Sequence, residues 1–512
     1  MRLITTAVLT VLLTAVLSPD LPTEAAAEEP ALPAGLSGDE RNEDQSEAAS
    51  DEPALPGGLN GGDDGEPALP GGLDEDSAED GPALPEGLDE APEHEAADQP
   101  PEQRPPLWEE LGLTGFWELR GGVRTQADRH QKDASIGEAR LQLEWKRQWR
   151  GLRLGARADL LYDPVYDHHT VDLDEGQGLF DLREAKVGFS PLEFMDVEAG
   201  RQILTWGTGD LLFLNDLFPK DWVSFLTGRD VEYLKAPSDA VKVSIFGDLA
   251  NVDFVYTPVF DADRYVRGQR LSYYSSTLGR RAGRDAVIHG DEPETWFSDA
   301  EYAVRVHRNI DSYELAGYGY WGYWKSPGGM DPATGKATFP RLNVYGASVR
   351  GPALWGIANA EVAYYQSRED QSGNDPMVNN SQMRFLLGWE RDMPEIADDF
   401  TVGVQYYVKW MLDHDDYLRT LPAGTPAADE DRHVVTLRLT KQYLNQNLTL
   451  SLFTFYSPTD ADAYLRPNIR YDVTDNWRVE LGGNVFFGKY EHTFFNQFAR
   501  NSNIYGAVRY SF

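Results

Sequence analysis

The sequence has no cysteine, few basic residues and, after its first residues, no long apolar run. The lack of cysteine excludes disulfides, thiolate metal sites, cysteine nucleophiles and the lipidated cysteine of a bacterial lipoprotein. A membrane-spanning helix needs about 20 apolar residues in succession, so the mature chain can enter a membrane only through β-strands. The 46 Lys and Arg stand against 84 Asp and Glu, a net charge of -38, which argues against nucleic-acid binding.

Aromatic residues are abundant despite this polarity. They make up 12% of the chain, with 25 Tyr, 22 Phe and 13 Trp. Many Tyr and Trp residues in a chain of low mean hydropathy are typical of membrane β-barrels, in which only one face of each strand meets lipid.

The first 27 residues have the features of a secretory signal peptide. Arg2 supplies a positive charge, residues 4–17 form a short apolar core, and residues 25–27 are three alanines suited to cleavage. We expect residues 1–27 to be removed, so that the mature chain begins at Glu28. An uncleaved anchor helix is the alternative, although the apolar run is shorter than a bilayer requires.

Residues 28–106 form an acidic tail, with 24 Asp or Glu against two Arg. The tail has no aromatic residue and is rich in Pro, Gly and Ala, so we expect it to be disordered. Four copies of Pro-Ala-Leu-Pro-x-Gly-Leu contain its candidate docking residues, which are Leu32, Leu36, Leu55, Leu59, Leu69, Leu73, Leu84 and Leu88. The repeats are either a linker expanded by duplication or a set of weak sites for a periplasmic or inner-membrane export component.

The remainder, residues 107–512, alternates between apolar and polar residues over about ten positions at a time, as strands of an outer-membrane barrel do. We predict an all-β transmembrane antiparallel barrel of about 18 strands (16–18). The predicted spans are 113–126, 136–148, 152–163, 179–189, 193–206, 239–246, 250–257, 296–308, 312–324, 340–350, 354–366, 381–390, 399–413, 431–442, 447–457, 461–472, 476–488 and 502–512. Short connections alternate with mostly longer ones, which predicts short periplasmic turns, long external loops and a periplasmic tail.

The C-terminus carries a candidate assembly signal. Val508, Tyr510 and Phe512 alternate along one face of the last strand. A terminal Phe after alternating apolar residues resembles the signal that outer-membrane barrels present to the barrel assembly machinery. We therefore expect this machinery, membrane lipid and lipopolysaccharide to be partners.

Charged residues are predicted to face the interior of the barrel. A barrel of 16 to 18 strands leaves an aqueous lumen, and mixed charges suit its wall. The pore-lining candidates are Glu118, Arg120, Arg124, Glu138, Arg140, Glu144, Arg153, Arg157 and Asp159. Alternatively, these residues pair across strands inside a plugged barrel.

The connection after the fifth predicted strand is unusually apolar for a loop. Folding into the lumen would bury its apolar residues and narrow the pore, whereas a loop that caps the rim or contacts another subunit is the alternative. The constriction candidates are Asp210, Phe213, Asn215, Asp216, Phe218 and Trp222.

A family resemblance is found at the start of this connection. Residues 200–207, Gly-Arg-Gln-Ile-Leu-Thr-Trp-Gly, are followed by Asp210, by Asn215-Asp216 and by Pro219. This segment resembles alginate-export-type porins and a related group of outer-membrane barrels associated with exporters of the resistance-nodulation-division type. The resemblance covers about 20 residues and implies a porin-like barrel with a transport role.

The next long connection has six arginines, Arg264, Arg267, Arg270, Arg280, Arg281 and Arg284, for which we expect an external basic patch. Such a patch would contact lipopolysaccharide phosphates or attract an anionic solute to the pore.

Enzymatic motifs are absent from the sequence. It has no Gly-x-Ser-x-Gly elbow, no His-Glu-x-x-His and no phosphate loop. His168 and His169 are adjacent on a predicted strand end, where neighbouring side chains point to opposite faces. We expect no catalytic residue, no metal and no cofactor.

The expected function is an outer-membrane channel or export-associated transporter whose tail docks a partner. A non-conducting barrel that anchors a periplasmic tether is the alternative, and an outer-membrane enzyme is a third possibility.

Overall fold

The computed structural model describes residues 112–166 and 170–512. The predicted signal peptide and acidic tail, together with His168 and His169, lie outside the described residues.

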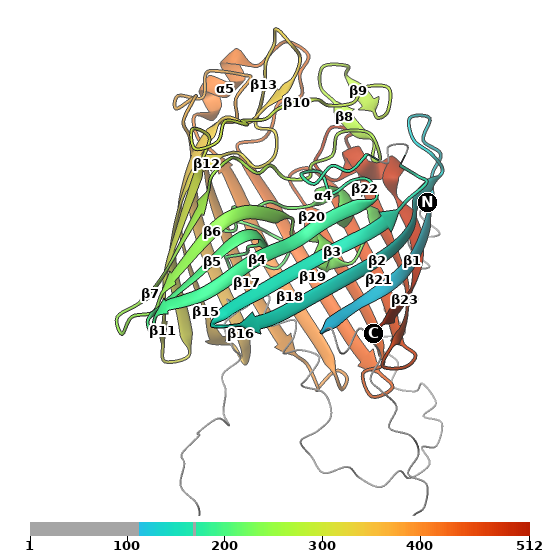
Figure 1. The fold of residues 1–512 in the computed structure, drawn as a ribbon. Helices are drawn as coiled ribbons and strands as arrows, with labels where there is room; N and C mark the ends of the chain where they lie inside the picture. Colours follow the sequence, from blue (N-terminus) through green and yellow to red (C-terminus); the bar gives the residue numbers. More distant parts are fainter. Residues whose placement is uncertain (1–111, 167–169) are drawn as a thin grey trace, which may run out of the picture. The chain divides into compact units, whose positions relative to one another are not determined.

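The described chain forms a closed antiparallel barrel of 18 strands (Figure 1), which confirms the predicted fold class. Each strand pairs with its neighbours along the chain, and pairing of the last strand with the first closes the barrel. The barrel strands are β1 (Leu113–Arg124), β2 (Ala134–Trp149), β3 (Leu152–Tyr162), β4 (Phe180–Leu192), β5 (Met195–Ile203), β6 (Pro237–Ile245), β7 (Asn251–Thr257), β11 (Glu301–Ile310), β12 (Tyr313–Tyr323), β15 (Arg341–Ala353), β16 (Gly356–Ser367), β17 (Gln382–Asp392), β18 (Phe400–Met411), β19 (Asp431–Tyr443), β20 (Leu448–Ser457), β21 (Asp462–Asp472), β22 (Trp477–Gly488) and β23 (Asn503–Ser511).

Smaller elements lie in the connections, and the sequence reading did not predict them. They are α4 (Trp222–Thr227), η1 (Val231–Leu234), β8 (Tyr273–Ser275), β9 (Arg280–Ala282), β10 (Gly290–Asp291), β13 (Gly329–Met330), β14 (Ala337–Thr338), α5 (His414–Thr420) and η2 (Asn496–Asn501). No helix in the described part of the chain is long and apolar enough to cross a membrane.

The two ends of the barrel differ in their connections. One end has turns of a few residues, and the other has the long connections that contain β8 to β10, β13, β14 and α5 (Figure 1). Short turns opposite long loops are the arrangement of outer-membrane barrels, in which the long loops are external. We therefore call the end with the long loops the external end.

The barrel wall is polar inside and apolar outside. In β1, Glu118 and Arg120 are buried in the interior, whereas Leu119 and Val123 on the other face are 56% and 60% exposed. A soluble protein would bury the two apolar side chains and expose the charges. The reversed pattern shows a wall whose outer face meets lipid.

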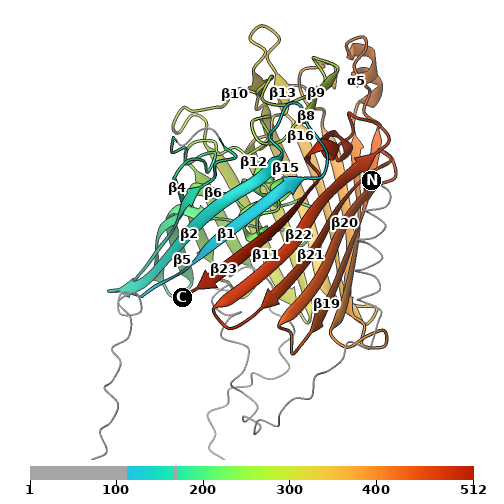
Figure 2. The same cartoon turned by 90° about the vertical axis from the view of Figure 1, so that its right-hand side faces the viewer.

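Strands β1 and β23 lie side by side at the seam that closes the barrel (Figure 2). Aromatic side chains cluster on the outer face of this seam. Trp117 makes an edge contact with Trp477, and the Trp477 ring lies 5.0 Å from that of Tyr510. Such rings are typical of the interface between the lipid core and water. At the end of the seam, the backbones of Phe512 and Gly115 exchange two hydrogen bonds, of 2.9 and 3.1 Å.

We expect replacement of Phe512 by Asp to lower the membrane-inserted fraction, because it places a charge at the lipid-facing end of the closing strand. The measurement is the heat-modifiable, folded fraction on an unheated gel. Arg419→Asp, in the exposed part of α5, is the matched control, and equal insertion of both variants would contradict the assembly-signal hypothesis.

Candidate functional site

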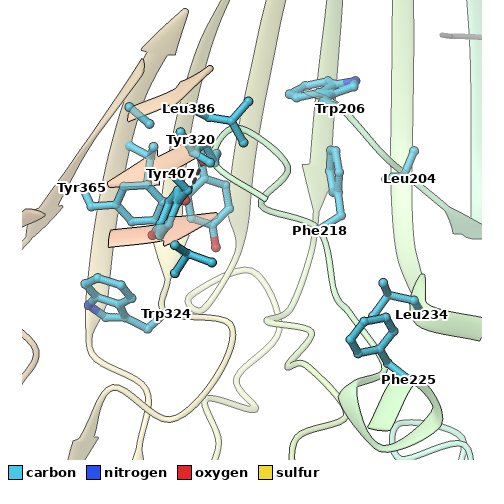
Figure 3. Packing of buried hydrophobic residues seen from close by; sticks show 14 of the residues in the cluster. Leu204, Trp206, Phe218, Phe225, Leu234, Tyr320, Trp324, Tyr365, Leu386 and Tyr407 are labelled. Carbon is cyan, nitrogen blue, oxygen red and sulfur yellow. Dashed lines mark hydrogen bonds between the residues drawn. The ribbon is translucent and has the colours of Figure 1, made fainter. Parts of the chain in front are cut away.

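The connection between β5 and β6, residues 204–236, lies inside the barrel and is called here the crossing segment. Figure 3 shows Leu204, Trp206, Phe218, Phe225 and Leu234 packed within the barrel. These side chains are buried in one large cluster with residues of the wall, including Tyr320, Tyr365, Leu386 and Tyr407. The apolar residues of this connection are therefore sheltered from water by the lumen wall.

The short helix α4, within the crossing segment, is capped at both ends by local residues. The carboxylate of Asp221 accepts a hydrogen bond of 2.7 Å from the backbone N–H of Ser224, which caps the first turn. Gly228 ends the helix at φ 94, a conformation that glycine adopts without strain. A Cβ at Gly228 would also lie 2.4 Å from the ring of Tyr505, so no other residue fits here.

One side of the crossing segment is held by β16. Glu361, buried in the wall, accepts hydrogen bonds from the Asn215 side chain at 2.7 Å and from the Thr208 hydroxyl at 2.9 Å. The Tyr365 hydroxyl donates to the backbone oxygen of Leu214 at 2.5 Å. The neighbouring strand β15 has Gly346 here, where a Cβ would collide with Asn215.

The other side is held by β1, β2 and β23. Arg120 donates to the backbone oxygen of Gly228 at 2.8 Å. Arg229 pairs with Glu138 at 2.6 Å, and Arg509 pairs with Asp230 at 3.4 Å. Because these strands lie across the barrel from β16, the crossing segment spans the lumen.

All six predicted constriction residues belong to this segment, and most serve to fix it. Asn215 binds Glu361, Asp216 pairs with Lys220 at 2.9 Å, and Trp222 donates to Asp263 at 3.0 Å. Phe213 and Phe218 pack against Trp222 and Trp206, with ring centroids 6.1 and 5.0 Å apart. Asp210 alone of the six pairs with a wall arginine, Arg438 of β19.

The nine predicted pore-lining residues all carry interactions with other protein groups. Glu118, Arg120, Glu138, Arg140 and Asp159 are buried, and Arg124, Glu144, Arg153 and Arg157 are partly buried. Their contacts are the pairs Arg120 with Glu118 and Glu480, Arg140 with Glu138 and Asp159, Arg157 with Glu144 and Glu184, Arg153 with Asp196, and Arg124 with the Arg270 backbone. Two of the buried members, Arg120 and Glu138, also hold the crossing segment, through the Gly228 backbone and through Arg229.

The expected external basic patch is wrong for two of its six arginines. Arg264 pairs with Asp181 at 2.8 Å and Arg270 pairs with Asp163 at 2.5 Å, and both are buried. The physical reason is that burying an arginine is tolerated when a carboxylate faces it, and the sequence does not show that these aspartates lie opposite.

The other four arginines also have protein partners. Arg267 pairs with Glu175 and Glu292, Arg280 with Asp285, and Arg281 with Glu491, while Arg284 donates to the backbone oxygen of Val165.

A small pocket remains where the connection of residues 258–300 packs on the crossing segment. Its volume is about 50 Å³, and its lining includes Tyr166, Asp221, Arg229, Arg264 and Arg270. That volume holds water molecules and no larger solute.

Two charged side chains next to β19 are exposed to water inside the barrel. Arg438 projects from the inner face of β19 and pairs with Asp210, yet their side chains are 36% and 35% exposed. Inward-facing charges with this exposure line an aqueous space. The sequence reading did not single out Arg438 or Glu361, because nothing in the sequence shows which residues lie opposite the crossing segment.

Asp261, beyond the external end of β7, carries a partly buried carboxyl group. Burial raises its pKa to about 7; the ammonium of Lys325 and the hydroxyl of Ser238 oppose this rise, and Glu301 and Asp239 add to it. Its carboxylate accepts hydrogen bonds from the Ser238 hydroxyl at 2.6 Å and from the Asp239 N–H at 3.1 Å.

We expect the connection of residues 258–300 to open more readily at about pH 8 than at about pH 5. Because the folded pKa of Asp261 is raised above its ordinary value, its contribution is full below that ordinary value and is lost as pH rises through about 7. Hydrogen exchange of this connection measures the effect. Asp261→Asn should reduce the pH dependence, and an unchanged difference in that variant would contradict the assignment.

No group of three or more His, Cys, Asp or Glu residues suited to a metal ion occurs within residues 112–166 and 170–512.

Comparison with known proteins finds no matching family and no matching curated protein. Solved structures of low sequence identity do match. OccAB4 of Acinetobacter baumannii is 11% identical, with 78% of this chain and 97% of that chain covered and a TM-score of 0.46. OccK3 (OpdO) of Pseudomonas aeruginosa is 9% identical, with 79% and 97% covered and a TM-score of 0.44. OccK11 (OpdR) of the same organism is 10% identical, with 79% and 96% covered and a TM-score of 0.43. The resemblance to alginate-export-type porins is not shown by these comparisons.

Proposed function

We propose that this protein is a narrow, solute-selective channel of the bacterial outer membrane, constricted by its crossing segment. The observation that supports the proposal is the contrast between the two sides of that segment. Next to β2, the segment is fixed to the wall by the ion pair of Arg229 with the buried Glu138. On the β19 side, Asp210 and Arg438 are in contact with water, so we place the passage there.

A non-conducting barrel that anchors a tether is the second candidate. It is favoured by the ion pairs that fix the crossing segment to the wall, Arg229 with Glu138 and Arg509 with Asp230, because a fixed plug needs no passage. Planar-bilayer recordings of the purified mature protein separate the two. Discrete conductance steps support the channel, and a folded barrel that gives no steps supports the anchor.

We further propose that the four Leu-bearing motifs of residues 28–106 dock a periplasmic or inner-membrane export component. The support is their sequence alone, in which apolar pairs recur on an acidic, Pro-rich spacer. Capture from envelope extracts by the tail should be abolished when all eight motif Leu residues are changed to Ser. Recovery of the same proteins by both forms would reduce the tail to a linker.

A further inference from the structure

Three basic residues form a row on the inner wall near the external end. Arg384 of β17 lies directly opposite Lys409 of β18, and Lys409 lies directly opposite Arg432 of β19. Two residues from these cations, on the side away from the external end, Leu386, Tyr407 and Val434 are buried in the cluster that includes the crossing segment. Alternate residues of a strand share a face, so all three cations face the lumen above the constriction.

The three positive charges of the row are not matched by an equal number of neighbouring negative charges. Arg432 pairs with Asp460 at 2.5 Å, whereas Arg384 stacks on the Tyr365 ring at 3.7 Å and donates to the neutral Gln382 side chain at 2.9 Å. Lys409 has no hydrogen-bond or ion-pair acceptor among the described residues. One carboxylate therefore balances three cations.

A second observation also indicates that an anion binds at this row. The Nη2 atom of Arg432 is buried and has no hydrogen-bond partner within the described chain. A buried donor without a partner is costly, and like charges directly opposite each other on a sheet are destabilising. Both costs are removed if an anion with several acceptor oxygens binds between the three side chains.

We propose that Arg384, Lys409 and Arg432 bind the carboxylate or phosphate group of a small anionic solute that enters from the external end. This proposal rests on the channel function proposed above and assigns a substrate class to it. The row lies on the inner face of the wall, on the side away from the headgroups of the surrounding bilayer. Carboxylate and phosphate share the oxygen geometry that guanidinium groups recognise.

Titration calorimetry on the full mature protein in detergent tests the site, with sodium phosphate and sodium succinate as separate probes. We expect Lys409→Gln to weaken binding of the preferred probe about tenfold, the effect of losing one charge-assisted hydrogen bond. Lys146→Gln is the matched control, because Lys146 is a lysine of β2 that pairs with Glu144 at 3.0 Å. The Lys146→Gln variant should bind the probe with the affinity of the unmodified protein. Equal affinities of the Lys409→Gln and Lys146→Gln variants for the probe would overturn the proposal.

Ion selectivity provides a separate measurement. Lys409→Glu should shift the reversal potential in a salt gradient toward cations, and Lys146→Glu should shift it less. A barrel that binds either probe through Lys409 but gives no conductance would refute the channel function and leave the anion site standing. A conducting barrel in which neither Lys409 variant differs from its control would refute the anion site alone.

Discussion

Removing residues 210–222 should raise single-channel conductance several-fold. This stretch contains Asp210, which lies at the proposed passage, and the apolar residues that fill the lumen beside it. A barrel of 18 strands is wide enough to hold an aqueous channel when nothing crosses it. Planar-bilayer recordings of the variant measure the change.

Two further variants make this experiment decisive. Replacing residues 210–222 with the same number of Gly and Ser residues keeps the chain length and removes the side chains, so a rise in conductance is again expected. Removing the exposed residues 332–335 between β13 and β14 is the control and should leave conductance unchanged. A heat-modifiable, correctly inserted deletion variant with normal conductance would contradict the constriction.

Replacing Arg120 with Met should destabilise the barrel by about 3–5 kcal/mol, the cost of removing one partner from a buried ion pair. The Arg120 side chain is 1% exposed, and it pairs with Glu118 at 2.9 Å and with Glu480 at 2.7 Å. It also holds the backbone of Gly228. Without Arg120, the carboxylate of Glu480 loses its guanidinium partner, and the crossing segment loses one anchor.

Denaturant unfolding in lipid vesicles measures this change in the free energy of unfolding. Lys146→Met is the control, since the Lys146 side chain is 46% exposed and its pair with Glu144 should contribute about 0–1 kcal/mol. A second variant, Arg120→Met with Glu480→Gln, should recover part of the loss because it removes the uncompensated charge. Equal stability of the Arg120 and Lys146 variants would show that the buried network does not stabilise the barrel.

The strands could be predicted from the sequence because a period of two is a local property. Each of the 18 barrel strands overlaps a predicted span, with ends that differ by a few residues. At β11, the predicted span begins at 296 but the strand begins at Glu301. Trp296 and Phe297, which extended the apparent pattern, are exposed residues of the preceding connection, where Phe297 has a positive φ of 66.

The interior could be predicted only in part, because it depends on contacts between distant residues. The apolar composition of the crossing segment favours a place away from water, and the structure gives it one in the lumen. Nothing local to Glu361 or Arg438 indicates that they meet Asn215 and Asp210 more than 140 residues away. Asp221 and Gly228 cap α4, but a helix of six residues is too short to show a periodic pattern in the sequence.

The anchors of the crossing segment also bear on the order in which the barrel folds. The two seam strands meet through Arg509 and Glu118, which are 391 positions apart along the chain. The crossing segment binds both strands from inside, through Gly228, 108 positions from Arg120, and through Asp230, 279 positions from Arg509. It therefore divides one long chain closure into two shorter ones, each with a lower entropic cost. In the folded barrel, the crossing segment therefore holds the first and last strands together from inside, in addition to the ladder of the seam itself.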